Sequence, residues 1–225
     1  KNLINDYLAS INDIKIDYVE IGFRFLDNKK KGALAYTKES FLKKLKIPKQ
    51  LNLGVMINAS DFLNKSQKPD LLIKKNFLIQ KKSKVKLIRI ACHFKEIFQI
   101  EVLVDTLKNL GYEIAINVMQ ISERSKDEIL KAADKIKKLN VNVLYFADSL
   151  GSLEPKKIKK IISTIKKKWK GEIGIHTHDN IGKALDNSLT ALNNGVTWVD
   201  TTVLGMGRGP GNTKTELAIL EFNKL

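Results

Sequence analysis

Residues 172–203 read EIGIHTHDNIGKALDNSLTALNNGVTWVDTTV, and this stretch decides the fold class. It begins with a short apolar run, Glu172–His176, and ends with another, Thr197–Val203. Between these runs, Ile181–Asn194 places small and apolar side chains on one compact stripe of a helix, and Gly195 is suited to ending that helix. A strand, a helix and a second strand in this order predict a parallel βαβ unit, because parallel strands need a crossover connection.

The same unit recurs along the chain. Candidate strands start 25 to 34 residues apart, which leaves room for a helix in each connection. Their near-continuous apolar character is typical of parallel strands that are buried on both faces. The predicted strands are Asp17–Gly22, Leu51–Ile57, Val85–Ala91, Glu113–Met119, Asn142–Ala147, Glu172–His176 and Thr197–Val203.

Amphipathic stretches fill the connections between these strands. The predicted helices are Leu3–Ile11, Glu96–Leu110, Ser125–Leu139, a helix opened by Ser152 and Pro155, Ile181–Asn194 and Thr215–Lys224. Ser152 followed by Pro155 has the order of a helix cap and an early proline. We see no linker, low-complexity segment or shift in composition, so residues 1–225 are predicted to form a single domain.

Seven strands are one fewer than a closed (β/α)8 barrel contains. Because the chain opens with a helix-like stretch that would follow a strand, we expect strand 1 to lie before Lys1. Both ends of the sequence look like cuts rather than natural termini. We therefore predict an α/β fold, a TIM barrel that lacks strand 1 in this sequence. An open, doubly wound sheet is the alternative.

Charge and composition narrow the classes of function. The formal net charge of +16 suggests nucleic-acid binding, but only four of the 40 basic residues are arginine, the residue preferred for bidentate contacts with bases and phosphates. The lysines decorate solvated helix faces such as Lys156–Lys168, so we predict no nucleic-acid partner. No apolar run approaches the ~20 residues of a membrane span, and no signal peptide is recognisable. Cys92 is the single cysteine, which favours a cytoplasmic location and a small buried apolar role for its side chain.

Three histidines, His93, His176 and His178, stand at the ends of predicted strands, where barrels of this kind build their active sites. In an extended segment residues i and i+2 point to the same side, so His176 and His178 face one way. Two neutral imidazoles this close favour a divalent metal, and a metal or an acidic partner is expected nearby. A purely structural pair is the alternative. Asp179 and Asn180 are interpreted as the cap of the next helix.

A glycine-rich segment, Leu204–Asn212 (LGMGRGPGN), follows the last predicted strand. Its backbone N–H groups are able to cradle a phosphate, and its glycines equally suit a tight turn. Asn212 offers a carbonyl oxygen, a ligand type that suits magnesium or manganese. Arg208 is a candidate partner for a substrate carboxylate, with an ordinary exposed arginine as the alternative.

These segments resemble one known superfamily. Gly174–Asn180, Val199–Asn212 and Thr215–Glu216 are similar to the metal-dependent lyases and carboxyltransferases that include 3-hydroxy-3-methylglutaryl-CoA lyase, 4-hydroxy-2-oxovalerate aldolase and isopropylmalate synthase. Val19–Gly22 (VEIG) and Phe146–Gly151 (FADSLG) resemble that superfamily's second and sixth strands. The resemblance spans nearly the whole chain, and GIHTHDN and the glycine-rich segment are its most specific parts.

The resemblance implies a TIM barrel that binds Mn²⁺ or Mg²⁺ through His176 and His178, with Asn212 as a further ligand or a neighbour of the ligands. It also implies an Arg-Asp pair at the end of strand 1, and this sequence contains neither residue of that pair. The site is therefore incomplete as given. Either a longer chain supplies the pair, or the barrel is catalytically decayed and has a binding role.

Within the superfamily, the aldolase branch fits better than the acyl-CoA branches. Val19–Arg24 (VEIGFR) and Arg89–His93 (RIACH) resemble that branch, which places a histidine after strand 4. His93 is thus predicted to face the substrate as a catalytic residue, with a hydrogen-bonded loop histidine as the alternative. Arg24 is a second catalytic candidate, as a carboxylate contact.

The predicted activity is cleavage of a carbon–carbon bond in a 2-oxo acid, with a pyruvate-type product. The metal is expected to stabilise an enolate, and His93 or a base outside this segment is expected to move the hydroxyl proton. Asp148, Ser149 and Arg208 are predicted to bind the substrate. An acetyl-CoA-dependent Claisen synthase is the alternative within the superfamily. The predicted partner is this small molecule, without a membrane, and a homo-oligomer is left open.

Overall fold

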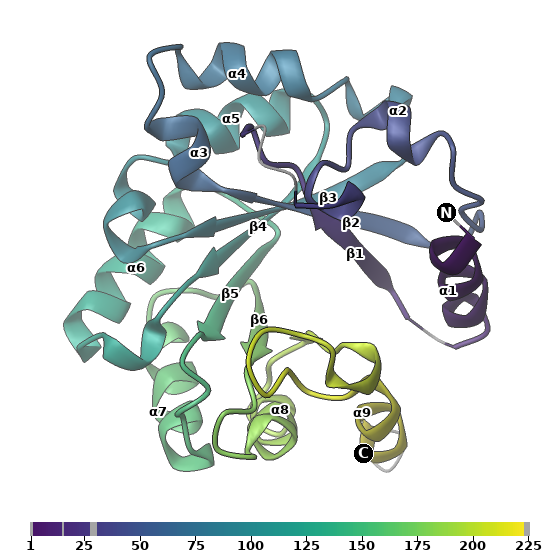
Figure 1. The fold of residues 1–225 in the computed structure, drawn as a ribbon. Helices are drawn as coiled ribbons and strands as arrows, with labels where there is room; N and C mark the ends of the chain where they lie inside the picture. The colour runs from purple at the N-terminus through teal and green to yellow at the C-terminus, as the bar shows by residue number, and fades with distance from the viewer. Residues whose placement is uncertain (1, 15, 28–30, 223–225) are drawn as a thin grey trace. The chain divides into compact units, whose positions relative to one another are not determined.

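The computed structural model of the chain describes residues 2–14, 16–27 and 31–222. Strands and helices alternate, and Figure 1 follows their order by colour from the N-terminus to the C-terminus. The strands are β1 Tyr18–Phe23, β2 Asn52–Asn58, β3 Val85–Cys92, β4 Glu113–Val118, β5 Val143–Asp148, β6 Glu172–Thr177 and β7 Trp198–Val199.

The α-helices occupy the connections between the strands. They are α1 Asn2–Asn12, α2 Glu39–Leu42, α3 Ala59–Leu63, α4 Pro69–Asn76, α5 Glu101–Asn109, α6 Lys126–Lys138, α7 Pro155–Ile165, α8 Ala184–Leu192 and α9 Thr215–Phe222. Short 3-10 helices are η1 Ala33–Ala35, η2 Gln80–Lys82, η3 Phe94–Phe98, η4 Ile121–Glu123 and η5 Val203–Gly205. Within the described residues, no helix is both long enough and apolar enough to cross a lipid bilayer.

The strand order of the sheet follows the chain, β1-β2-β3-β4-β5-β6-β7. The pairs β1–β2, β2–β3, β5–β6 and β6–β7 are parallel. A doubly wound sheet reverses its strand order partway, whereas a (β/α) barrel adds each new strand beside the last. The predicted α/β barrel class is therefore confirmed. The strand expected before Lys1 stays a prediction.

The residues group into two compact units. Unit 1 comprises residues 1–91 and 99–115, and unit 2 comprises residues 92–98 and 116–225. β4 contributes its first half to unit 1 and its second half to unit 2. The single domain inferred from uniform composition stays a prediction.

Each unit has its own apolar interior. In unit 1, β2 and β3 bury almost every side chain, as expected for strands covered on both faces, and α4 packs against α3 and α5. In unit 2, all six residues of β5 are buried, and each of α6, α7, α8 and α9 packs against its neighbour in the chain. α6 begins as its sequence predicts: the Ser125 hydroxyl accepts from the Glu128 N–H, and the Glu128 carboxylate accepts from the Ser125 N–H.

Two helix predictions need correction. The predicted helix Glu96–Leu110 is divided, because the Glu96 carboxylate accepts the His93 N–H and closes the short turn η3 before α5 begins. Ser152 does not cap α7: its N–H donates to the Asp148 carboxylate, and Glu154 occupies the cap position before Pro155.

Candidate functional site

Two imidazoles meet at the end of β6. The ring centroids of His176 and His178 lie 5.1 Å apart with an angle of 86° between the ring planes. His176 pairs in register with Ala147 of β5, so both rings lie at the carboxyl end of this parallel pair of strands. Alternation along an extended strand accounts for their common side.

Asp200, which directly follows β7, holds His176 in place. Its Oδ2 atom lies 2.9 Å from His176 Nδ1, and both side chains are about four-fifths buried, with exposed fractions of 19% and 21%. A carboxylate at Nδ1 makes that nitrogen the donor and leaves the lone pair of Nε2 free for a metal. The sequence indicated an acidic partner without naming it, and the signal available was an aspartate at the end of the strand next to β6.

His178 has an environment that favours the neutral ring. Burial is the largest cause that lowers its pKa, and the positive charges of His176, when protonated, and of Arg208 act in the same direction. A hydrogen bond with the Gly211 backbone opposes them. A neutral imidazole has the lone pair that a metal ligand needs.

Asn212 lies beside this histidine pair. His178 and Asn212 form an isolated antiparallel bridge, and the neighbouring Asp179 N–H donates to the Gly211 carbonyl at 3.0 Å. Asn212 is 8% exposed, and within the part of the chain that the structure describes its Oδ1 atom has no hydrogen-bond donor. A buried acceptor without a donor is costly, and a bound cation would satisfy it.

The glycine-rich segment is a folded turn rather than an open cradle. Four of its N–H groups donate within or beside the segment: Gly205 to Thr202 O, Met206 to Val203 O, Gly211 to Arg208 O and Asn212 to Gly205 O. These donors are therefore engaged, which favours the tight-turn interpretation over the phosphate cradle. The turn also explains why β7 is shorter than predicted, since Thr202 pairs with Thr213 and Lys214 instead of continuing along β6.

We expect Gly211→Ala to disrupt this turn. Gly211 has a φ of 97°, and an added Cβ would lie 2.0 Å from the Gly205 carbonyl oxygen, whose hydrogen bond positions Asn212. The free energy of unfolding should fall by at least about 2 kcal/mol, and metal binding should weaken. Gly209→Ala is the matched control: its φ is also positive, at 63°, but nothing lies within 4 Å of the added Cβ. Equal losses in urea denaturation of the two variants would contradict the proposed role of the close approach.

The other predicted site residues of unit 2 lie at neighbouring strand ends. His93 follows β3, and its Nδ1 lies 3.1 Å from Gln120 Oε1, after β4. The Gln120 N–H donates to Ser149 Oγ, after β5, and Arg208 Nη2 makes a long contact of 3.4 Å with the Ser149 carbonyl. His93 and Arg208 are exposed. Gln120 was not identified as a site residue from the sequence. Its backbone is in the left-handed region with a φ of 56°, and no feature of the sequence indicates this conformation.

The position of Asp148 disfavours its predicted role in substrate binding. It is fully buried, and its two carboxylate oxygens accept the N–H groups of Ser152 and Leu153 at 3.1 and 3.0 Å. Burial raises its pKa, while these backbone hydrogen bonds act to lower it. Asp148 therefore organises the turn after β5, an arrangement that disfavours the predicted contact with the substrate.

Arg24, in unit 1, is also in a position that disfavours its predicted role. Its side chain is fully buried, and its guanidinium donates to Thr37 O twice, to Asn76 O and to Glu39 Oε1. It stacks on the Phe77 ring with 4.5 Å from the guanidinium carbon to the ring centroid. A guanidinium so fully engaged has no free edge for a substrate carboxylate.

The donor set near His176 and His178 fits part of a divalent-metal site. Two imidazole nitrogens and one amide oxygen are compatible with Mn²⁺ or Mg²⁺. Within the described residues, no three His, Cys, Asp or Glu side chains form a metal-binding group on their own. Asn212 is not one of these four residue types, so its amide oxygen is a further donor beside the two histidines.

Comparisons with known proteins identify a matching family and named relatives. The profile of the HMGL-like family matches residues 77–225. A curated 4-hydroxy-2-oxovalerate aldolase from Pelotomaculum thermopropionicum is 33% identical over 140 residues, which cover 62% of this chain and 41% of that protein. A 4-hydroxy-2-oxovalerate aldolase from Geobacillus genomosp. 3 is 29% identical over 157 residues, which cover 70% of this chain and 47% of that protein. The chain spans less than half the length of these curated relatives.

Solved structures match nearly the whole chain. The N-terminal domain of a proposed aldolase from Bacteroides vulgatus has a TM-score of 0.80 and 31% identity, and the match covers 99% of this chain and 73% of that one. A Bacillus subtilis HMG-CoA lyase has a TM-score of 0.81 at 14% identity, with coverage of 99% and 78%. The second likeness concerns the fold alone.

Proposed function

Because the chain belongs to the HMGL-like family, we propose that it is part of a divalent-metal-dependent aldolase that cleaves a 4-hydroxy-2-oxo acid and releases a pyruvate-type product. The observation that carries the proposal is the pairing of His176 and His178 beside the buried, unsatisfied oxygen of Asn212. Relatives named as 4-hydroxy-2-oxovalerate aldolases favour this class of substrate over an acyl-CoA.

We assign His176, His178 and Asn212 as the residues that would hold Mn²⁺ or Mg²⁺. When bound there, the ion would supply Lewis-acid stabilisation of the negative charge that develops on the 2-oxo group as the carbon–carbon bond breaks. Asp200 would keep the His176 ring in one orientation and one tautomer. No lysine is needed as a covalent catalyst in this scheme.

Arg208 is the proposed partner for the substrate carboxylate. Its guanidinium is exposed, and its one hydrogen bond with the described residues is the long one to the Ser149 carbonyl, so several of its donors are available for a bidentate pair. Ser149 lies beside it, with its hydroxyl oxygen fixed by the Gln120 N–H. The proposed partner is thus a small 2-oxo acid, rather than a nucleic acid or a membrane.

His93 is the proposed group that accepts the proton of the substrate hydroxyl. Its Nδ1 faces the amide oxygen of Gln120, so in the neutral ring Nδ1 carries the proton and Nε2 carries the lone pair. The exposed position of the ring allows Nε2 to reach a bound ligand.

The test is aldol cleavage by the natural-length protein. Pyruvate release from 4-hydroxy-2-oxovalerate would be followed with and without Mn²⁺, after removal of metal by a chelator. We expect activity that depends on the added metal. Condensation of acetyl-CoA with a 2-oxo acid, in place of cleavage, would assign the protein to the Claisen synthases. Metal binding without either reaction would favour the catalytically decayed barrel.

Asp200→Asn should weaken metal binding about 10- to 100-fold, because an amide in place of the carboxylate no longer fixes the His176 tautomer. Mn²⁺ titration followed by electron paramagnetic resonance measures the change. Asp186→Asn is the control. Asp186 is exposed in the first turn of α8, its one ion pair with a described residue is to Lys183, and its replacement should leave the Mn²⁺ affinity unchanged. An unaltered affinity in Asp200→Asn would remove Asp200 from the site.

A further inference from the structure

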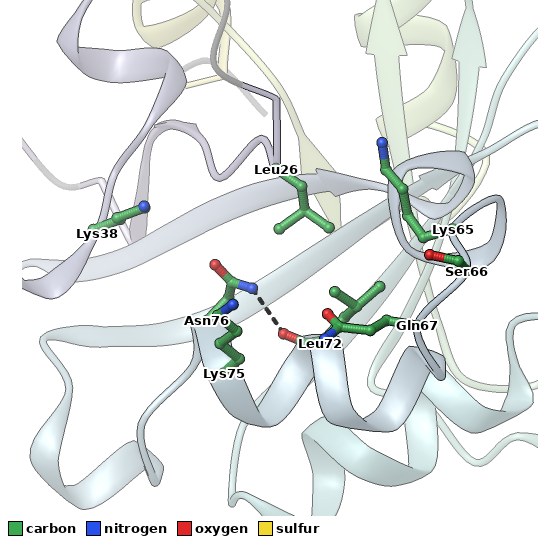
Figure 2. Close-up of a pocket in the computed structure, with 8 residues that line it drawn as sticks. All are labelled: Leu26, Lys38, Lys65, Ser66, Gln67, Leu72, Lys75 and Asn76. Atoms are coloured by element: carbon green, nitrogen blue, oxygen red, sulfur yellow. Dashed lines mark hydrogen bonds between the residues drawn. The ribbon is translucent and has the colours of Figure 1, made fainter.

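Unit 1 contains a cavity of about 390 Å³ that is open to solvent and is lined by none of the residues of the proposed metal site. Its walls come from the connection after β1, from the turn between α3 and α4, and from α4 itself (Figure 2). In a (β/α) barrel, connections that follow strands carry the ligand-binding residues. The volume lies within the range of small-molecule sites.

The charge of this cavity is uniformly positive. Lys38, Lys65 and Lys75 line it, and among the residues that the structure describes no aspartate or glutamate does. None of the three ammonium groups has an ion pair or hydrogen bond with any described residue, whereas two nearby acids are engaged elsewhere, Asp70 with Lys74 and Glu39 with Arg24. Three uncompensated cations around one hollow raise the local concentration of anions.

The remaining lining combines polar donors with an apolar wall. The Ser66 hydroxyl and the Gln67 amide line the cavity and have no partner among the described residues. Leu26 and Leu72 supply the apolar part. Figure 2 shows Lys38 on one side of Leu26 and Lys65 with Ser66 on the other. A ligand that fills the cavity therefore needs a negatively charged group and a short carbon skeleton.

Two hydrogen bonds hold the floor of the cavity in place. Asn76 Nδ2 donates to the Leu72 carbonyl at 2.8 Å, the bond drawn in Figure 2, and the Asn76 carbonyl accepts from the buried Arg24 guanidinium at 3.2 Å. A floor fixed before binding reduces the conformational entropy lost when a ligand is ordered.

We propose that this cavity is a binding site for a small phosphorylated metabolite, separate from the proposed metal site. Lysine binds phosphate as a point charge, and the three lysines that line the cavity supply enough positive charge for a phosphate monoester, which carries a charge of about −1.5 to −2 at neutral pH. The phosphate lies among the lysines with Ser66 and Gln67 as neutral donors, and the carbon skeleton lies against Leu26 and Leu72. Every lining residue belongs to unit 1, so this proposal does not depend on the metal.

Isothermal titration of the natural-length protein with glycerol 3-phosphate tests the proposal, with glycerol and succinate as comparison ligands. We expect saturable binding of glycerol 3-phosphate with a dissociation constant below about 1 mM, and much weaker binding of the other two. The triple variant Lys38→Gln/Lys65→Gln/Lys75→Gln should weaken it about 30-fold, roughly threefold for each charge lost at an exposed position.

The matched control is Lys156→Gln/Lys159→Gln/Lys167→Gln, which removes the same charge from exposed positions of unit 2. It should alter the affinity less than twofold. Equal weakening by both triple variants would show attraction to the net charge of the protein rather than a site, and would overturn the proposal. Succinate binding as tight as that of glycerol 3-phosphate would overturn the assignment to phosphate.

Discussion

His178→Ala is expected to abolish stoichiometric binding of divalent metal and to lower the Mn²⁺ affinity by more than about 100-fold. His178 supplies one of the two imidazoles whose centroids are 5.1 Å apart, and the loss of one ligand leaves a site too weak to retain the ion. The measurement is metal content by mass spectrometry of the natural-length protein, together with Mn²⁺ titration. We expect the same result for His176→Ala.

His93→Ala is the control for this experiment. It also removes an imidazole at a strand end, but the contact of His93 is with Gln120, so the metal content should stay unchanged while aldol cleavage falls. Stoichiometric manganese in His178→Ala would refute the metal assignment. Absence of specific metal from the unaltered protein would withdraw the mechanism and make a catalytically decayed barrel the better interpretation.

Arg24→Met is expected to lower the free energy of unfolding by about 3–5 kcal/mol, the range for a buried ion pair that loses one partner. The substitution leaves the Thr37 and Asn76 carbonyls without their donors from Arg24. It also leaves the Glu39 carboxylate, whose side chain is 12% exposed, with the Ser83 hydroxyl as its remaining hydrogen-bond donor among the described side chains. Urea denaturation measures the effect.

Arg124→Met provides the comparison, because Arg124 pairs with Glu123 and Glu128 at the surface and is 27% exposed. Pairs of that kind contribute at most about 1 kcal/mol. If Arg24→Met were as stable as Arg124→Met and instead lost affinity for the substrate, the original interpretation of Arg24 as a carboxylate contact would return.

Features that depend on local order along the chain were predictable from sequence. The strand bounds agree within two residues for β1 to β6, because runs buried on both faces are continuous and apolar. The bounds of α6, Lys126–Lys138, agree with the predicted helix Ser125–Leu139 to within one residue at each end. The histidine pair was predictable as well, because residues at positions i and i+2 of an extended segment point to the same side.

Features that depend on contacts between distant residues were decided by tertiary structure. Asp200 meets His176 across 24 positions because β6 and β7 are neighbours in the sheet. Arg24 looked like a ligand-binding residue, yet Thr37, Glu39 and Asn76 enclose its guanidinium. The lysines at positions 38, 65 and 75 belong to three different segments that meet only in the fold. The periodicity of apolar residues in the sequence indicates which face of an element is buried. The partners of a residue across a sheet or a cavity depend on how distant segments pack, and no local pattern in the sequence specifies that packing.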